Sequence, residues 1–163
     1  MNLVGFQGGS SIFELGVTTD MYCFFSLIKE RIGLDEREKF LVDRLFRKYL
    51  RFDDLDNATA LILKIKISLS EVPCDTAVLK KFGWNKEESL LKIECANFAE
   101  MFEMYFESYE HCAKSAKYLY DDWGLYRPVK VSFSEEPFFT LENLRPLEDY
   151  DNLALDSLPF WMR

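Results

Sequence analysis

The chain has 163 residues, of which 48% are hydrophobic and 16% aromatic, so it can bury a substantial core and is not an intrinsically disordered chain. Its formal net charge of −8 would repel a phosphate backbone, which argues against direct binding to nucleic acid. Neither an internal repeat nor a Pro/Gly/Ser-rich linker divides the sequence, so we expect a single domain over residues 1–163.

The N-terminal 33 residues predict a β-hairpin followed by a helix. Two apolar runs, MNLVGFQ and SIFELGV, flank a glycine and serine cluster at residues 8–11, which is typical of a turn between two strands. Thr18, Thr19 or Asp20 then offers a side-chain oxygen to cap a helix over MYCFFSLIKERI, and Gly33 ends that helix.

Helices also dominate the next fifty residues. Apolar residues recur at helical spacing after Asp35, which predicts a second helix. Residues 54–70 fit both a strand alternation and a helical stripe; we favour a helix because the segment is longer than a typical strand and Asp53 or Asp54 can cap it. A short helical turn closed by Gly83 follows.

The remaining pattern indicates two more strands separated by a long helix. SLLKIEC at residues 89–95 alternates like a strand, and Asn97 caps a helix that extends to about Asp122. LYRPVKVSF at residues 125–133 contains the clearest strand, which lies at a sheet edge or begins after Pro128. We therefore predict an α+β fold in which a small, mostly antiparallel sheet, built from the N-terminal hairpin and C-terminal strands, packs against several helices.

The cysteines and the hydropathy pattern indicate a cytoplasmic protein. Cys23, Cys74, Cys95 and Cys112 form no C-x-x-C pair, and no charged and then apolar leader opens the chain. We expect all four thiols to be reduced and to pack as small hydrophobic side chains. No apolar run approaches the roughly 18 residues of a membrane span, so no membrane association is expected.

Catalytic and metal-binding patterns are weak. His111 and Cys112 are adjacent, so on a helix their side chains diverge by about 100° and do not form a nucleophile and base pair. The segment DDLDNA lacks the glycine and the terminal glutamate of a calcium loop, and the histidine and cysteines lack zinc-ligand spacing. We therefore assign no catalytic residues, no metal site and no cofactor.

An acidic run near the C-terminus is the main candidate for a binding surface. Residues 135–156 contain seven acids and one base, and aromatic side chains lie between them, the mixture found at protein-binding patches. Most such runs are simply solvated faces. The residues that we expect to bind a partner are Asp121, Asp122, Glu135, Glu136, Glu148, Asp149, Tyr150 and Asp151.

Three stretches resemble a family of bacterial immunity proteins that protect against polymorphic toxins, including those of contact-dependent growth inhibition. They are FAEMFEMYFESYEHC, WGLYRPVKVSF and RPLEDYDNLALDSLPFWMR. The family's pattern is met here by Pro146, Leu147, Glu148, Tyr150, Asp151, Pro159, Phe160, Trp161 and Arg163. The resemblance covers about 70 C-terminal residues well and the N-terminal half loosely.

The resemblance implies a non-enzymatic cytoplasmic protein that binds a cognate toxin domain, commonly a nuclease, as a monomer in a 1:1 complex. Inhibition would occlude the active site or the substrate groove, or use β-augmentation at an exposed strand edge. A nuclease needs a basic cleft for phosphate, and an acidic partner complements it. The alternatives are another acidic interaction module, such as an adaptor or a nucleic-acid mimic, and a small enzyme built on His111 or a carboxylate pair.

The last residues, PFWMR, are unusually apolar for a chain terminus. Burying Phe160, Trp161 and Met162 would contribute several kcal/mol at about 25 cal/mol per Å². We expect them to pin the end of the chain against the sheet or helices as a short edge segment, with the preceding acids left in water.

Overall fold

A three-stranded antiparallel sheet organises the protein, with strand order β2-β1-β3. The computed structural model describes residues 3–134 and 145–163, and the predicted binding residues Glu135 and Glu136 lie outside the described residues. β1 (Leu3–Gly8) pairs with β2 (Ser11–Val17) and with β3 (Lys130–Ser134). The predicted hairpin, the C-terminal edge strand and the α+β class are confirmed.

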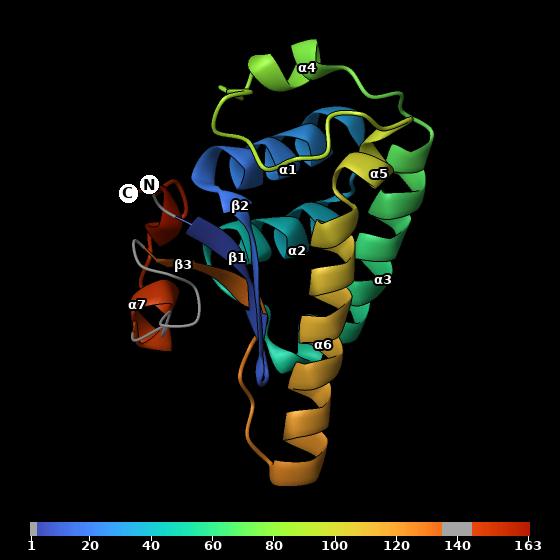
Figure 1. Ribbon diagram of the computed structural model, residues 1–163. Coiled ribbons are helices and arrows are strands. Elements are labelled where there is room, and N and C mark those ends of the chain that lie inside the picture. Colours follow the sequence, from blue (N-terminus) through green and yellow to red (C-terminus); the bar gives the residue numbers. More distant parts are fainter. Residues whose placement is uncertain (1–2, 135–144) are drawn as a thin grey trace.

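The described residues also form seven α-helices, of which α1, α2 and α6 pack against the sheet and α3 lies beside α6 (Figure 1). Their bounds are α1 Thr18–Arg31, α2 Glu36–Arg47, α3 Phe52–Ser70, α4 Thr76–Lys80, α5 Phe98–Met101, α6 Glu103–Trp123 and α7 Leu147–Asp151. A short 3-10 helix, η2 (Phe160–Met162), ends the chain. None of these helices is long and apolar enough to cross a membrane.

The hairpin turn is glycine-rich because it lies against α6. Gly9 has φ +56°, a left-handed conformation that glycine adopts without strain. A Cβ on Gly8 would stand 2.7 Å from the carbonyl oxygen of Cys112, and one on Gly9 would stand 2.4 Å from the backbone of Ser115. The turn therefore requires glycine for close approach as well as for conformation.

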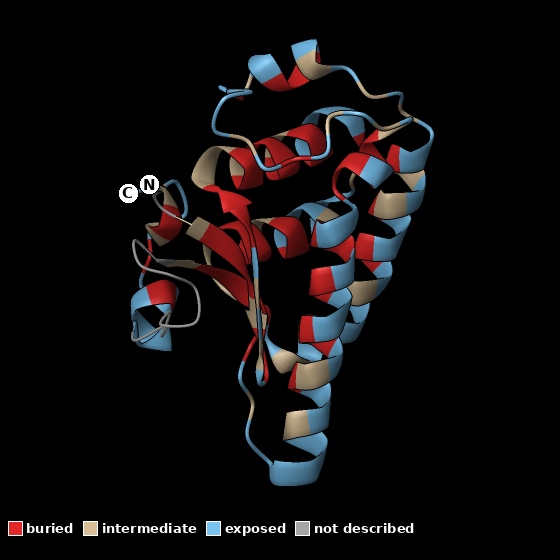
Figure 2. Ribbon diagram, in the orientation of Figure 1, coloured by how far each residue is buried: buried red, intermediate tan, exposed pale blue. Residues whose placement is uncertain are grey.

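The core lies between the sheet and the helices. Phe6 on β1 places its ring 6.1–6.4 Å from Phe24 of α1 and from Tyr105 and Tyr109 of α6. Figure 2 shows the buried residues of α1, α2 and α6 on the sides that face the sheet. Edge-to-face aromatic pairs such as these add about 0.5–1.5 kcal/mol each to the area that they bury.

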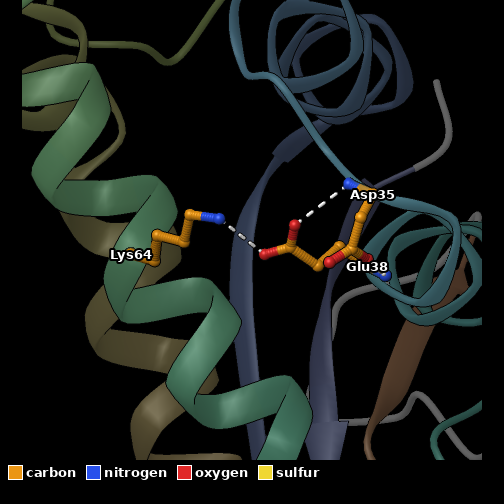
Figure 3. Close-up of polar contacts among 3 residues, drawn as sticks. All are labelled: Asp35, Glu38 and Lys64. Atoms are coloured by element: carbon orange, nitrogen blue, oxygen red, sulfur yellow. Dashed lines mark hydrogen bonds and ion pairs between the residues drawn. The ribbon is translucent and has the colours of Figure 1, made fainter.

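A side-chain cap begins α2 but not α3. Asp35 caps α2 in a capping box with Glu38, whose carboxylate also accepts a 2.7 Å bond from Lys64 of α3 (Figure 3). Asp53 and Asp54 do not cap α3, because that helix already begins at Phe52, so both residues lie in its first turn. Asp54 instead forms an ion pair with Arg37 of α2.

The predicted caps of α1 are also wrong, because this helix already begins at Thr18, with Val17 at the N-cap position. Asp20 has another role. Its carboxylate is buried and accepts hydrogen bonds from Ser89 Oγ at 2.7 Å and from the Leu90 backbone N–H at 2.9 Å. Burial raises the pKa of Asp20, while these donors oppose the shift. Asp20 therefore fastens the segment after α4 onto α1.

The predicted strand at residues 89–95 is absent, since this stretch is irregular in the structure. Leu91 is buried, and the segment is held by the bonds to Asp20 and by an isolated bridge between Pro73 and Asn97. That bridge brings Cys74 next to Cys95, and the two form a disulfide. The expectation of four reduced cysteines is thus wrong for this pair, whereas Cys23 and Cys112 are free and buried as predicted.

The long helix predicted from Asn97 is split into α5 and α6. Asn97 accepts a hydrogen bond from the Glu100 N–H at 2.9 Å, so this cap is confirmed. Phe102 departs from helical geometry and separates the two helices. α6 then continues to Trp123 and ends at Gly124, which has φ +65°.

Candidate functional site: the acidic and aromatic end of helix α6

The structure separates the predicted binding residues into two groups. Asp121 and Asp122 lie at the C-terminal end of α6, and Glu148, Asp149, Tyr150 and Asp151 lie on α7. Figure 1 shows α7 beyond the β3 side of the sheet, whereas the end of α6 projects from the bottom of the molecule. The predicted residues therefore do not form one surface.

Tyr150 does not belong to an exposed surface, which corrects its assignment as a binding residue. Its side chain is 2% exposed. The ring packs edge-on against Phe160 at 5.1 Å and Tyr49 at 6.3 Å, and Lys130 Nζ lies 5.0 Å from the ring centre. Tyr150 therefore docks α7 onto β3.

The acids of α7 are exposed, but two of them hold local contacts. Asp151 accepts a 2.7 Å hydrogen bond from the Tyr49 hydroxyl, and Asp149 lies 3.4 Å from Arg145. Burial, followed by the bond to Asp151, raises the pKa of Tyr49. Asp151 therefore helps to attach α7 to the body of the protein, whereas the contact between Asp149 and Arg145 lies within the C-terminal segment.

The terminal aromatic motif completes this attachment. Trp161 is 2% exposed, donates a 2.8 Å hydrogen bond from Nε1 to the Phe46 carbonyl and stacks edge-on with the Phe46 ring. The guanidinium groups of Arg145 and Arg163 lie over the Phe160 ring, 4.0 and 4.8 Å from its centroid. The prediction that the terminus is pinned is confirmed, but through a 3-10 helix and not an edge segment.

The end of α6 has the opposite character. Trp123 is 75% exposed and Tyr118 is 64% exposed, and Leu125 just beyond the helix is also exposed. Asp121 and Asp122 lie between these apolar side chains and are exposed as well. We call residues Tyr118, Asp121, Asp122, Trp123 and Leu125 the α6 tip. It combines aromatic anchors with negative charge, as protein-binding hot spots do.

Packing at the base of the α6 tip holds it in place. Tyr120 stacks on Phe52 with ring centroids 4.0 Å apart, and the Tyr126 hydroxyl donates a 2.7 Å hydrogen bond to the Leu50 carbonyl. A hydrogen bond with the Asp122 carboxylate raises the pKa of Tyr118. A preordered binding surface loses less conformational entropy when a partner docks.

The sequence identified the carboxylates of the α6 tip but not its aromatic residues. The buried series on α6, Tyr105, Tyr109, Cys112 and Ala116, stops one turn before Tyr120. Figure 2 shows the change from buried to exposed residues down this helix. The length of the predicted helix could have indicated that its end is exposed. A helix of 21 residues extends past strands of 5–7 residues, so its last turns have no sheet to pack on.

His111 and Cys112, the residues considered above for catalysis, pack against other parts of the fold. His111 is exposed, and its ring stacks near Phe13 at 5.7 Å. Burial raises the pKa of the Cys112 thiol to about 12, so the thiol stays protonated at neutral pH. In residues 3–134 and 145–163, no three His, Cys, Asp or Glu side chains gather as a metal site would require.

Comparison of the chain with protein-family models, with curated proteins and with solved structures found no match. The resemblance to toxin-immunity proteins therefore remains a prediction from the quoted motifs. Several of those motif residues, including Tyr150, Phe160 and Trp161, have packing roles in this fold.

Proposed function

We propose that this protein is a non-enzymatic immunity protein that binds a cognate toxin domain and blocks its activity in the cytoplasm. The observation that supports the proposal is the α6 tip, where the 75% exposed side chain of Trp123 lies beside the exposed Asp121 and Asp122. Large exposed aromatic side chains cost solubility, and a partner that covers them offsets that cost.

The expected partner is a basic domain, commonly a nuclease. Its phosphate-binding cleft would carry Lys and Arg side chains, which the net charge of −8 attracts over long range. The carboxylates of the α6 tip then take the positions of substrate phosphates at the cleft, while Trp123 and Tyr118 bury apolar area. Charge would govern the association rate, and the aromatic anchors would govern dissociation.

The proposed cytoplasmic action implies a reducing environment, in which disulfides are rare. The segment that carries Cys74 and Cys95 is also held by the Pro73–Asn97 bridge and by the two hydrogen bonds to Asp20. We therefore expect the α6 tip, which lies far from this segment in Figure 1, to bind equally well with the disulfide reduced.

The gene neighbourhood supplies the first test, because the proposal expects an adjacent gene for a large secreted effector with a variable C-terminal domain. That domain is then expressed with and without this protein, and growth, complex formation and catalytic activity of the toxin are measured. Continued killing together with no complex on gel filtration would reject the proposal.

A variant pair locates the interface. Trp123→Ala should weaken the complex by about 2 kcal/mol or more if this side chain is an anchor. Leu155→Ala, which truncates an exposed apolar residue outside the α6 tip, serves as the matched control and should leave affinity unchanged. Equal effects of the two substitutions would place the interface elsewhere.

A further inference from the structure

An apolar cleft runs between α3 and α6, away from the α6 tip. Its volume is about 430 Å³, within the range of small-molecule sites in proteins. Leu55 and Ile62 of α3 and Phe106 and Ala113 of α6 contribute to its lining. Figure 1 shows the two helices side by side along this region. The lining segments, 55–66 and 106–117, each cover about 16 Å at 1.5 Å per residue.

The rim of this cleft carries more positive than negative charge, unlike the protein as a whole. Lys66, Lys114 and Lys117 line it together with Asp56 and Glu110. Lys117 is paired with Asp56 at 3.0 Å, and Lys114 with Glu110 at 2.8 Å.

Lys66 and Lys114 therefore share a single carboxylate. Lys66, across the cleft on α3, also helps to lower the pKa of Glu110, after the larger effects of Lys114 and His111. Among the described residues, Lys66 forms no ion pair of its own. One positive charge at the rim is left without a matching carboxylate, directly beside an apolar floor.

We propose that the cleft between α3 and α6 binds a long-chain fatty acid, with the alkyl chain on the apolar floor and the carboxylate at Lys66. An alkyl chain gains about 0.8 kcal/mol per buried methylene group, which favours a flexible chain along this apolar floor. A ligand carboxylate would make the charges at this rim equal, with three cations and three anions. The inference does not depend on the proposed immunity function.

Dodecanoate is the probe, and isothermal titration calorimetry on the full chain is the measurement. We expect a 1:1 complex with a dissociation constant on the order of 10 μM. Dodecyltrimethylammonium, which has the same alkyl chain and the opposite charge, should bind at least about tenfold more weakly. Each amphiphile is kept below the concentration at which it aggregates. Absence of dodecanoate binding, or equal affinity for the two probes, would overturn the proposal.

Two neighbouring lysines on α3 provide a matched pair of variants. Lys66→Gln should weaken dodecanoate binding about tenfold. Lys64→Gln removes the same charge from a lysine that does not line the cleft and that pairs with Glu38 (Figure 3), so it should change affinity less than about twofold. Equal losses would show a general charge effect and overturn the assignment to this cleft.

A third variant blocks the cleft without altering its floor. Ala60 lines the wall and is exposed, so Ala60→Trp adds bulk toward solvent and should abolish binding while circular dichroism stays unchanged.

A second cleft of about 600 Å³ lies near Phe40 and Lys39. Binding that survives Ala60→Trp but is lost in Lys39→Gln would move the ligand there and overturn the proposal. Binding only to anionic vesicles, and not to dodecanoate, would also overturn it.

Discussion

The C-terminal segment, residues 145–163, and the α6 tip contain similar residue types, acids interleaved with aromatic side chains, yet the fold uses them in opposite ways. In the C-terminal segment, Tyr150 and Trp161 are buried and the acids lie around them. At the α6 tip, Trp123 and Tyr118 are exposed beside Asp121 and Asp122.

The difference arises from what lies beneath each segment. α7 and η2 rest on β3 and α2, which offer Lys130, Tyr49 and Phe46 as partners. The α6 tip extends past the sheet, and the ring stacking lies at its base, where Tyr120 packs against Phe52 and Tyr126. An acidic and aromatic sequence therefore indicates a binding surface only when the supporting structure leaves the aromatic rings uncovered.

Trp161 and Trp123 give the largest contrast. Trp161→Ala should lower the free energy of unfolding by about 3–5 kcal/mol, because it empties a core site and leaves the Phe46 carbonyl without its donor. Trp123→Ala should change it by less than about 0.5 kcal/mol. Urea unfolding followed by circular dichroism measures both values.

Tryptophan fluorescence checks the same contrast without relying on stability. Acrylamide should quench Trp123 strongly and Trp161 weakly, and Trp123→Phe should remove most of the accessible signal. Similar stability losses in the two alanine variants would mean that the α6 tip is also a structural element, and the comparison would fail.

Lys130 offers a pH-dependent test of the C-terminal segment. Its side chain is 6% exposed beneath Tyr150, and burial lowers its pKa to about 8. Between pH 8 and about 10 the unfolded chain binds the proton more strongly than the folded chain, so this lysine makes the free energy of unfolding increase with pH. We expect a gain of about 1–2 kcal/mol between pH 7.5 and 9.5.

The control for this measurement is Lys130→Met. Burial raises the pKa of Cys23 and of Cys112 to about 12, and these thiols make stability fall with pH in the same range. The informative quantity is therefore the difference between the wild-type and Lys130→Met profiles, in which the thiol contributions cancel. A difference that is flat with pH would show that Lys130 is not desolvated by the C-terminal segment.

Charge reversals compare the two regions in binding. With a cognate toxin domain, Asp121→Lys combined with Asp122→Lys should slow association about tenfold at low salt and flatten its salt dependence. Glu148→Lys combined with Asp149→Lys makes the same change in net charge and should slow association less than about twofold, an effect measured by stopped flow. An equal slowing would show that total charge and not location determines the encounter.

Much of the fold follows from local sequence, because its signals act over a few residues. The glycine turn at residues 8–9, the capping box of Asp35 and Glu38, and the apolar spacing of α3 each specify their own element. The apolar and polar alternation at residues 89–95 led to the wrong prediction of a strand. Leu91 is buried, but its segment is irregular and is held by hydrogen bonds to Asp20.

The candidate site was only partly predictable, because its character depends on distant partners. Whether an acidic and aromatic run is buried is decided by contacts such as Trp161 with Phe46, which are 115 residues apart. Local patterns do not encode such pairs. The Cys74–Cys95 disulfide was missed for the same reason, since the chain crossing at Pro73 and Asn97 brings the two thiols together.

The smallest expected effect concerns whether the acids of α7 are structural. Tyr49→Phe and Asp151→Asn each remove the 2.7 Å hydrogen bond that joins α7 to the end of α2, and a double-mutant cycle isolates its contribution. Because Asp151 is exposed, we expect a coupling free energy of about 0.5–1 kcal/mol in urea unfolding. A coupling near zero, together with slower toxin association in Asp151→Asn, would reverse the comparison, since α7 would then present Asp151 to the partner.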